Sequence, residues 1–349
     1  MKETFFTLRT VMWEEDDTVR MIDQTVLPTR LVYKSYDSWE EVADAISRMV
    51  VRGAPAIGVA AAMGVALAAQ RSPAGGRRQL LKDLEKAAAG LRKTRPTAVN
   101  LFWGIDRVLA KARSVEGDPR AVKEALKEEV LLMAEEDVKA NMKMGKIGAS
   151  LLDDGDVVMT QCNAGALATV GYGTALGVVR AAREMGKCIR VVIPETRPAL
   201  QGARLTAFEL SHDGFDCMLI SDTAVGSVMA SGRADKVVVG ADRITKDGSV
   251  FNKIGTYQIA VLARRHGVPF YPVAPRSTFD MTRTYDQVTI EERSPDEVVR
   301  IRGRRIAPKG VPVYNPAFDR TPPELVSAIV SDEGIVRSPV DKNLASVIR

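Results

Sequence analysis

Two residues of types that transfer protons follow apolar stretches of this sequence. Asp242 comes directly after the apolar run 237–241, and Cys162 follows a β-rich run at 157–160. Burial at the end of a strand removes water from a carboxyl group, which raises its pKa and lets it donate a proton near neutral pH. Asp242 is therefore a candidate general acid, and the alternatives are a helix N-cap or an ion pair with Arg243.

Cys162 opens the sequence Cys-Asn-Ala-Gly, which we expect to lead directly into a helix that includes residues 171–177. A thiol beside a helix N-terminus has a lowered pKa and can transfer protons or act as a nucleophile. The alternative is a buried cysteine that packs as a small apolar side chain. That inert interpretation is favoured for Cys188 and Cys217, which lie beside or within predicted strands.

Residues 52–58, Arg-Gly-Ala-Pro-Ala-Ile-Gly, have a composition suited to binding an anion. Arg52 supplies a cation, and the small residues Gly53 and Ala54 allow close backbone approach just before a predicted helix. Such a helix N-terminus binds phosphate. A simple Gly-Pro turn beside a surface arginine is the alternative.

Further cations precede helical patterns elsewhere in the chain. Asn252 and Lys253 stand just before one such segment, and Arg95 lies in a turn between two others. The balance of 49 Lys and Arg against 44 Asp and Glu gives a net charge of +5, which is weak evidence for a nucleic-acid partner. A basic pocket for an anionic small molecule fits this charge equally well.

The cysteine and histidine content bears on metal sites and cellular location. Three scattered cysteines form neither a disulfide framework nor a C-x-x-C zinc pair, and two histidines argue against a histidine-based metal site. The N-terminus lacks a signal-peptide pattern, and the apolar run 56–69 is shorter than the ~20 residues that span a bilayer. We therefore expect a cytoplasmic protein in which 56–69 is a buried helix.

The elements that must position these residues indicate an α/β protein with two domains. In residues 1–135, β-branched stretches at 18–22 and 30–33 predict short antiparallel strands, and a capping box at Ser38 to Glu41 begins a series of helices. The helical patterns continue at 79–93, 98–113 and 119–148. We expect a smaller N-terminal domain of antiparallel strands and helices.

Residues 136–349 alternate between β-rich runs and helical patterns. The runs lie at 157–160, 189–193, 217–220, 236–239 and 270–273, and this alternation predicts a Rossmann-like domain with a parallel sheet. Polar residues follow each run. Because ligands bind at the carboxyl ends of such strands, we expect the active site at that edge of the sheet.

Several blocks of the sequence, taken together, resemble the methylthioribose-1-phosphate isomerase family in content and order over nearly the whole chain. The wider group includes ribose-1,5-bisphosphate isomerase and the regulatory subunits of translation initiation factor two-B. The blocks are RGAPAIG (52–58), QCNAG (161–165), ETRP with QGARLT (195–206), GADRI (240–244), NKIGT (252–256) and YNPAFD with TPPE (314–324).

The resemblance implies catalytic positions at Cys162 and Asp242, with Asp242 as the proton donor. It also implies a homodimer that acts on a small-molecule sugar phosphate, with no metal or organic cofactor and no nucleic-acid or membrane partner. The substrate-binding positions that it implies are Arg52, Gly53, Ala54, Arg95, Gln201, Asn252 and Lys253.

The implied reaction converts 5-methylthioribose 1-phosphate into 5-methylthioribulose 1-phosphate in methionine salvage. The C1 phosphate blocks ordinary ring opening, so a protonated Asp242 suits the cleavage step. Cys162 then either moves the C2 proton through an enediol-like intermediate or helps to form a dry pocket for a hydride shift. The alternatives to this function are an isomerase of 5-deoxyribose 1-phosphate or ribose 1,5-bisphosphate, and a non-catalytic regulatory subunit of the same fold.

Overall fold

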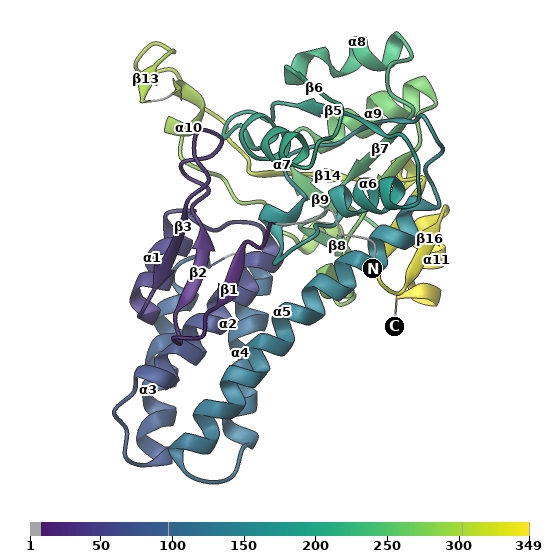
Figure 1. Cartoon of the computed structure of the whole chain (residues 1–349). Coiled ribbons are helices and arrows are strands. Elements are labelled where there is room, and N and C mark those ends of the chain that lie inside the picture. The colour runs from purple at the N-terminus through teal and green to yellow at the C-terminus, as the bar shows by residue number, and fades with distance from the viewer. Residues whose placement is uncertain (1–7, 97, 302, 349) are drawn as a thin grey trace. The chain divides into compact units, whose positions relative to one another are not determined.

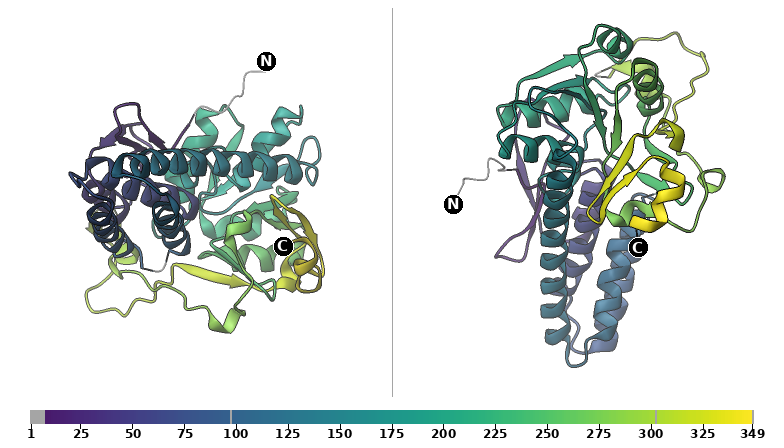
Figure 2. Two further views of the ribbon diagram at one scale, coloured as in Figure 1. Left: turned by 90° about the horizontal axis from the view of Figure 1, so that it is seen from below. Right: turned by 90° about the vertical axis from the view of Figure 1, so that its right-hand side faces the viewer.

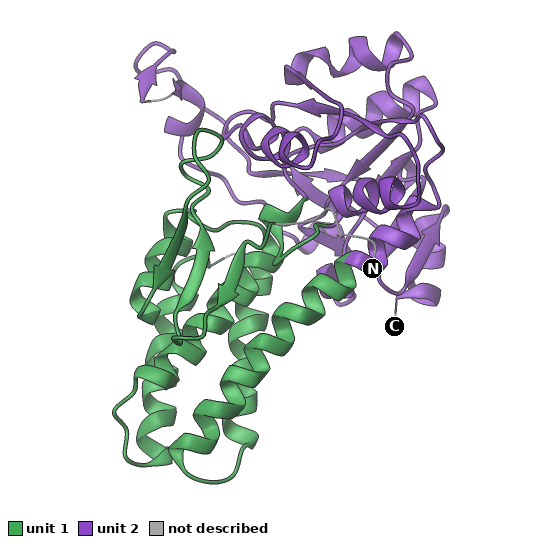
Figure 3. Cartoon of the chain, viewed as in Figure 1, with its two compact units in different colours: residues 1–141, 165–173 green, residues 142–164, 174–349 purple. Residues whose placement is uncertain are grey.

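The computed structural model describes residues 8–96, 98–301 and 303–348 and contains two compact units (Figure 3). Unit 1 comprises residues 1–141 and 165–173, and unit 2 comprises residues 142–164 and 174–349. The division falls inside helix α5 (Pro119–Ala149), as does the boundary after residue 135 proposed from the sequence. The division of the chain into an N-terminal domain of residues 1–135 and a second domain of residues 136–349 therefore stays a prediction.

Unit 1 combines a small antiparallel sheet with helices (Figure 1). The sheet confirms the antiparallel strands predicted from the sequence, but its third strand lies at 33–36 instead of 30–33. The capping box is present, since Glu41 N–H donates to Ser38 Oγ and Ser38 N–H donates to Glu41 Oε2. Besides α5, the elements of unit 1 are β1 (Val11–Trp13), β2 (Val19–Ile22), β3 (Tyr33–Tyr36), α1 (Trp39–Ser47), α2 (Ala54–Arg71), α3 (Arg77–Arg92) and α4 (Val99–Ser114).

Helix α2 forms the centre of the unit 1 core. It is long and apolar enough to cross a membrane, yet 78% of that stretch is buried inside the protein. Helices α1, α3 and α4 pack against it, and the long helices of unit 1 run alongside one another (Figure 2). These contacts confirm the buried helix that the alanine-rich run predicts.

Glycines let α2 and α4 approach each other closely. A Cβ atom on Gly104 would lie 2.3 Å from the carbonyl oxygen of Gly58, and one on Gly58 would lie 2.8 Å from the carbonyl oxygen of Asn100. These contacts fall within the first two turns of each helix. The N-terminal ends of α2 and α4 therefore lie side by side.

Unit 2 is built on a five-stranded parallel sheet with the strand order β10-β7-β4-β5-β6. This sheet confirms the Rossmann-like fold predicted from the sequence. Its strands are β4 (Val157–Met159), β5 (Arg190–Pro194), β6 (Cys217–Ile220), β7 (Lys236–Val239) and β10 (Phe270–Pro272).

The order of the strands reverses at β4. The chain places β5 and β6 on one side of β4 and then returns to place β7 and β10 on the other side. Strands β4 and β7 therefore flank the point of reversal, where open α/β sheets bind ligands in the crevice beyond the strand ends.

A second sheet in unit 2 has the order β11-β8-β9-β14, and two hairpins, β12-β13 and β15-β16, complete the strands. These strands are β8 (Arg243–Thr245), β9 (Val250–Lys253), β11 (Phe279–Asp280), β12 (Arg300–Ile301), β13 (Arg304–Arg305), β14 (Phe318–Thr321), β15 (Ala328–Ser331) and β16 (Gly334–Arg337). The helices are α6 (Ala175–Glu184), α7 (Ala207–His212), α8 (Val225–Ala230), α9 (Thr256–His266), α10 (Asp296–Val299) and α11 (Val340–Val347).

The prediction of a helix directly after Cys162 is wrong. The chain forms only a short 3-10 turn at Ala166–Ala168, and α6 begins at Ala175. Tyr172 and Gly173 have φ values of 70° and 87°, which are incompatible with a right-handed helix. Gly173 also packs so closely that a Cβ would lie 2.4 Å from Gly165 Cα. Gly165 and Gly173 thus allow this segment to adopt an irregular, closely packed conformation.

The close approach of α2 and α4 leads to a stability prediction. We expect Gly104→Ala to lower the free energy of unfolding by about 1–3 kcal/mol, because the added methyl group would overlap the backbone of Gly58. Gly226→Ala is the matched control, since a Cβ there lies 3.6 Å from Leu262 and alanine favours a helix. Denaturant unfolding checks both variants, and equal stability of the two would contradict the packing argument.

Candidate active site

Asp242 lies where β7 ends and β8 begins. The strand before it is buried from Val237 to Val239, and Asp242 itself is half-buried. Its N–H donates to the carbonyl oxygen of Phe251 at 2.8 Å, which places it beside β9. The helix N-cap alternative for Asp242 is wrong because a strand follows it.

The ion pair of the neighbouring arginine is also defined. Arg243 Nη1 lies 3.0 Å from Asp280 Oδ2, on the strand that pairs with β8. Arg243 thus has a carboxylate partner other than Asp242.

Cys162 has an unusual backbone conformation at the end of β4. Its φ is 60°, in the left-handed region, and its exposed fraction is 7%. This region disfavours residues with a Cβ by roughly 1–2 kcal/mol. Two hydroxyl groups hold the turn: Cys162 N–H donates to Thr196 Oγ1 at 3.0 Å, and Thr206 Oγ1 donates to the Cys162 carbonyl oxygen at 2.6 Å. Backbone strain held in this way is typical of functional sites.

The register of the sheet brings the ends of β4 and β7 together. Met159, the last residue of β4, pairs with Val237 of β7 in a parallel register. A Cβ on Gly240 would lie 2.8 Å from Ala164 Cβ, which shows how closely the two strand ends pack. The thiol and the carboxyl group proposed for catalysis therefore belong to the adjacent strands that flank the reversal of strand order.

The turn between β9 and α9 joins the same region. Gln161, next to Cys162, donates from Nε2 to the carbonyl oxygen of Ile254 at 2.9 Å. Asn252 is buried and donates from Nδ2 to Thr256 Oγ1 at 3.1 Å. Lys253 is buried too, with its Nζ 4.4 Å from the centre of the Phe318 ring. An amide and a cation therefore accompany the catalytic candidates.

A carboxylate occupies the N-terminus of α9. Asp319 accepts the N–H groups of Gly255 at 2.7 Å and of Tyr257 at 3.1 Å. Burial raises the pKa of Asp319 to about 6, although these hydrogen bonds and the charge of Lys253 oppose that shift. Because Asp319 takes these N–H donors, Lys253 is the group in this turn that suits a substrate anion.

Gln201 completes the candidates of unit 2. It has an exposed fraction of 7%, and its Oε1 is a buried acceptor that receives no hydrogen bond from the described residues. Gln201 directly precedes the π-helix at Gly202–Thr206, whose last residue bonds Cys162. The structure thus brings Gln201 together with Cys162, Asp242, Asn252 and Lys253 in unit 2. The unpaired oxygen suits a hydroxyl group of a ligand.

The candidates of unit 1 gather at the N-terminal ends of α2 and α4. Gly53 has a φ of 94°, and a Cβ on it would lie 2.4 Å from the carbonyl oxygen of Ala168, so glycine is required there. Ala54 begins α2, and Arg95 lies in the connection between α3 and α4. Arg52 donates from Nε to Gln24 Oε1 at 3.3 Å. Two cations and two adjacent helix N-termini suit a phosphate.

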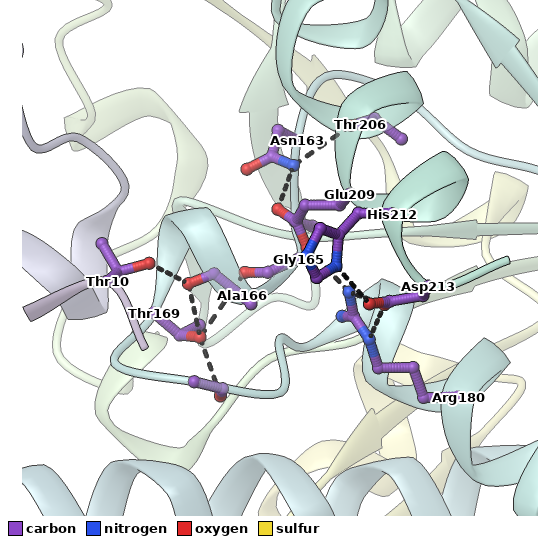
Figure 4. Close-up of polar contacts among 12 residues, drawn as sticks. Thr10, Asn163, Gly165, Ala166, Thr169, Arg180, Thr206, Glu209, His212 and Asp213 are labelled. Atoms are coloured by element: carbon purple, nitrogen blue, oxygen red, sulfur yellow. Dashed lines mark hydrogen bonds and ion pairs between the residues drawn. The ribbon is translucent and has the colours of Figure 1, made fainter. Parts of the chain in front are cut away.

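Hydrogen bonds anchor the segment against which Gly53 packs. Thr10 Oγ1 donates to the carbonyl oxygen of Ala166 at 2.7 Å (Figure 4), and Gln24 Nε2 donates to that of Leu167 at 2.7 Å. The Asp137 carboxyl group accepts Val170 N–H at 2.8 Å and Asn141 Nδ2 at 3.0 Å. This segment therefore fixes the start of α2.

Sequence reasoning missed the residues that hold Cys162. Thr196 lies in a polar strand end that the sequence pointed to, but neither Thr196 nor Thr206 carries a signal for its contact with Cys162. Glycine marks a left-handed position in a sequence, whereas cysteine and threonine do not. In the part of the chain that the structure describes, no group of three His, Cys, Asp or Glu residues is arranged to hold a metal ion.

Asp137 leads to a prediction about the pH dependence of stability. Burial raises its pKa from 3.8 to about 7, against the hydrogen bonds that it accepts. Its contribution to stability is therefore complete below pH 3.8 and is lost as the pH rises through about 7. Between pH 4 and 7, we expect Asp137→Asn to gain stability relative to the wild type by up to about 1.4 kcal/mol per pH unit.

Denaturant unfolding at several pH values tests this expectation. Asp153→Asn is the control, because the Asp153 side chain is 80% exposed, and we expect no comparable pH-dependent gain from it. A stability difference between Asp137→Asn and the wild type that does not vary with pH would refute the raised pKa.

Comparison with known proteins assigns the chain to a family. The model of the Initiation factor 2 subunit family matches residues 50–338. A curated Archaeoglobus fulgidus protein, "Putative methylthioribose-1-phosphate isomerase", is 52% identical over 345 residues, which cover 98% of this chain and 100% of that protein.

Two solved structures are similar over almost their whole length. The 5-methylthioribose 1-phosphate isomerase of Pyrococcus horikoshii is 46% identical with a TM-score of 0.94, covering 99% of this chain and 98% of that one. An A. fulgidus structure described as translation initiation factor eIF-2B, subunit delta, is 51% identical with a TM-score of 0.91, covering 98% and 99%. This chain belongs to the Initiation factor 2 subunit family and, within it, to the methylthioribose-1-phosphate isomerases.

Proposed function

We propose that this chain is an aldose-ketose isomerase that converts 5-methylthio-D-ribose 1-phosphate into 5-methylthio-D-ribulose 1-phosphate in methionine salvage. The observation that carries the proposal is the position of Cys162 and Asp242 after β4 and β7, the strands that flank the reversal of strand order. The identity of the proposed substrate comes from the names of relatives that are about 50% identical to this chain.

Asp242 is the proposed acid for ring opening. The anomeric carbon carries a phosphate, so the ring cannot open by the proton loss that ordinary sugars use. The Asp242 carboxyl group donates its proton to the ring oxygen as the bond between that oxygen and C1 breaks. Its position directly after a buried apolar strand, at the strand end where open α/β sheets bind ligands, supports this role.

The second step moves hydrogen from C2 to C1. In one route, Cys162 removes the C2 proton to form an enediol, C1 is then protonated, and loss of the O2 proton leaves the C2 ketone. In the other route, hydride passes directly from C2 to C1 in a pocket that excludes water, and the Asp242 carboxylate left by the first step accepts the O2 proton, which leaves the C2 ketone. The 7% exposure of Cys162 supports either role. Deuterium at C1 after reaction in D₂O identifies the first route.

The remaining candidates are proposed to bind the substrate. Arg52 and Arg95, with the backbone at Gly53 and Ala54, would hold the phosphate, because cations and helix N-termini both attract anions. The Gln201 and Asn252 side chains would bond sugar hydroxyl groups. Lys253 would supply a further positive charge.

Phosphorus NMR tests the proposed reaction and its acid. We expect the wild type to convert the anomeric phosphate signal of 5-methylthioribose 1-phosphate into that of a primary phosphate ester. Asp242→Asn removes the acidic proton and should lower kcat by about 10²- to 10⁴-fold. The exposed Asp216 provides the matched control, and Asp216→Asn should keep the wild-type rate.

The same assay distinguishes the alternatives. Activity retained by a Cys162→Ala, Asp242→Asn double variant would contradict the proposed site. If kcat/KM is higher for ribose 1,5-bisphosphate or 5-deoxyribose 1-phosphate than for 5-methylthioribose 1-phosphate, that compound becomes the proposed substrate. A folded wild type that converts none of these compounds would favour a regulatory role, as the translation-factor description of one structural relative suggests for that protein.

A cytoplasmic homodimer is part of the proposal. The location is supported by the few, unpaired cysteines. Dimerisation is supported by edge strand β6, where Met218 and Leu219 are 43% and 51% exposed. Sedimentation should give about twice the chain mass of 37.9 kDa, and the single-chain mass would contradict dimerisation.

A further inference from the structure

We propose that Thr196 and Thr206 are positioning residues for catalysis: their hydroxyl groups hold the Cys162 backbone in its left-handed conformation and so set the direction of the thiol. The kinetic consequence rests on the proposed isomerase function. The conformational claim does not, because the reactivity of the thiol can be measured without the substrate.

Both peptide groups at Cys162 are bonded by threonine side chains. The Thr196 oxygen accepts the Cys162 N–H at 3.0 Å, and the Thr206 hydroxyl donates to the Cys162 carbonyl oxygen at 2.6 Å. Both threonines are 0% exposed, so water does not compete for these bonds. A β-branched side chain has few χ1 rotamers, which keeps each oxygen in place.

Thr196 is itself fixed by a carboxylate from the next strand. Asp222, which follows β6, accepts the N–H groups of Thr196 and Arg197, each at 2.7 Å. Thr196 has a φ of 62°, so this residue also adopts a disfavoured conformation that its partners must maintain. The ends of β4, β5 and β6 are linked in this way through Asp222 and Thr196.

The position of Thr206 is fixed by the π-helix at Gly202–Thr206, which follows β5. A Cβ on Gly202 would lie 1.9 Å from the carbonyl oxygen of Pro194, so glycine is needed for the π-helix to return against the end of β5. Short π-helical segments occur frequently at functional sites. The return brings Thr206 to Cys162.

A buried polar network supports the same turn (Figure 4). Asn163 Nδ2 donates to Thr206 Oγ1 at 3.2 Å and to Glu209 Oε1 at 2.8 Å. Arg180 pairs with Glu209 at 2.9 Å and with Asp213 at 2.6 Å, and the three side chains are at most 3% exposed. These charges fix α7 against α6, and through Asn163 they fix the residue that follows Cys162.

The backbone conformation matters because φ and ψ set the direction of the Cα–Cβ bond. Loss of one threonine hydroxyl leaves a peptide group of Cys162 without its partner and releases the left-handed turn. A displacement of about 1 Å at a reacting group lowers a rate by up to about 10²-fold. The thiol would still be present but misdirected.

The first experiment compares valine and serine variants. We expect Thr196→Val and Thr206→Val to lower kcat at least ~10-fold with KM within about twofold, because they change the reacting group and not the binding groups. Thr196→Ser and Thr206→Ser retain the hydroxyl and should recover most of the activity. Thr245→Val is the control, since that buried hydroxyl donates to the carbonyl oxygen of Ser249 across the β8-β9 turn.

The second experiment measures the Cys162 thiol directly. In the full-length chain carrying Cys188→Ser and Cys217→Ser, Cys162 is the single cysteine, and iodoacetamide reports its reactivity over a range of pH. We expect each valine variant to change the alkylation rate constant at least ~3-fold, with serine restoring it and Thr245→Val leaving it unchanged. Circular dichroism selects folded variants.

The outcomes decide the proposal. A folded Thr196→Val or Thr206→Val variant with unchanged alkylation overturns it, as does an equal loss of kcat in Thr245→Val. If a valine variant does not fold, Asn163→Ala takes its place, because Asn163 Nδ2 donates to Thr206 Oγ1. Wild-type alkylation in a folded Asn163→Ala variant then overturns the proposal. A wild type without isomerase activity refutes the proposed function alone, since alkylation still tests the threonines.

Discussion

The reversal of strand order between β4 and β7 is the constraint on which unit 2 depends. Because β5 lies on one side of β4 and β7 on the other, the connections that follow β4 and β7 leave the sheet in opposite directions, which is the arrangement at which open α/β sheets bind ligands. The interior position of β4 explains its composition, since Val158 and Met159 are both 0% exposed. The candidate residues Cys162 and Asp242 lie just after the ends of these strands.

Several residues in the connections at that edge have backbone conformations that are unfavourable alone. Cys162, Thr196 and Leu200 all have positive φ values near 60°. Such positions persist only where the surroundings determine them fully, each at a cost of roughly 1–3 kcal/mol. Fully paired buried groups provide those surroundings here. Removing one partner from the Arg180, Glu209 and Asp213 cluster would leave a buried charge without its pair, which destabilises proteins by about 3–5 kcal/mol.

Unit 1 reaches close packing in another way, through glycine. Gly53 combines a positive φ with contact against the Ala168 backbone, and Gly58 and Gly104 let two helices meet at their N-terminal ends. Because these positions lack a side chain, the electropositive N-terminal ends of α2 and α4 can lie next to each other, close to Arg52. Substitution of one of these glycines would therefore change the position of a candidate binding group as well as the stability of the protein.

The sequence alone predicted the elements of this fold well because their patterns are local. The five apolar runs became the parallel sheet, and the alanine-rich run became a buried helix. The helix predicted directly after the Cys-Asn-Ala-Gly sequence, including residues 171–177, was wrong for the residues before Ala175, since the alanines there favour a helix and no local pattern encodes the positive φ of Tyr172 and Gly173 or the contact of Gly173 with Gly165. The bonds of Cys162 to Thr196 and Thr206 span more than 30 residues of chain, and no local pattern encodes them.

The central claim is that one substrate is bound and converted at the edge where β4 and β7 end. A crystal structure of the Asp242→Asn variant with 5-methylthioribose 1-phosphate tests it most directly. The account predicts that C1 and C2 of the sugar lie in contact with Cys162 Sγ and the residue 242 side chain. A sugar phosphate bound away from Cys162 and residue 242 would contradict it.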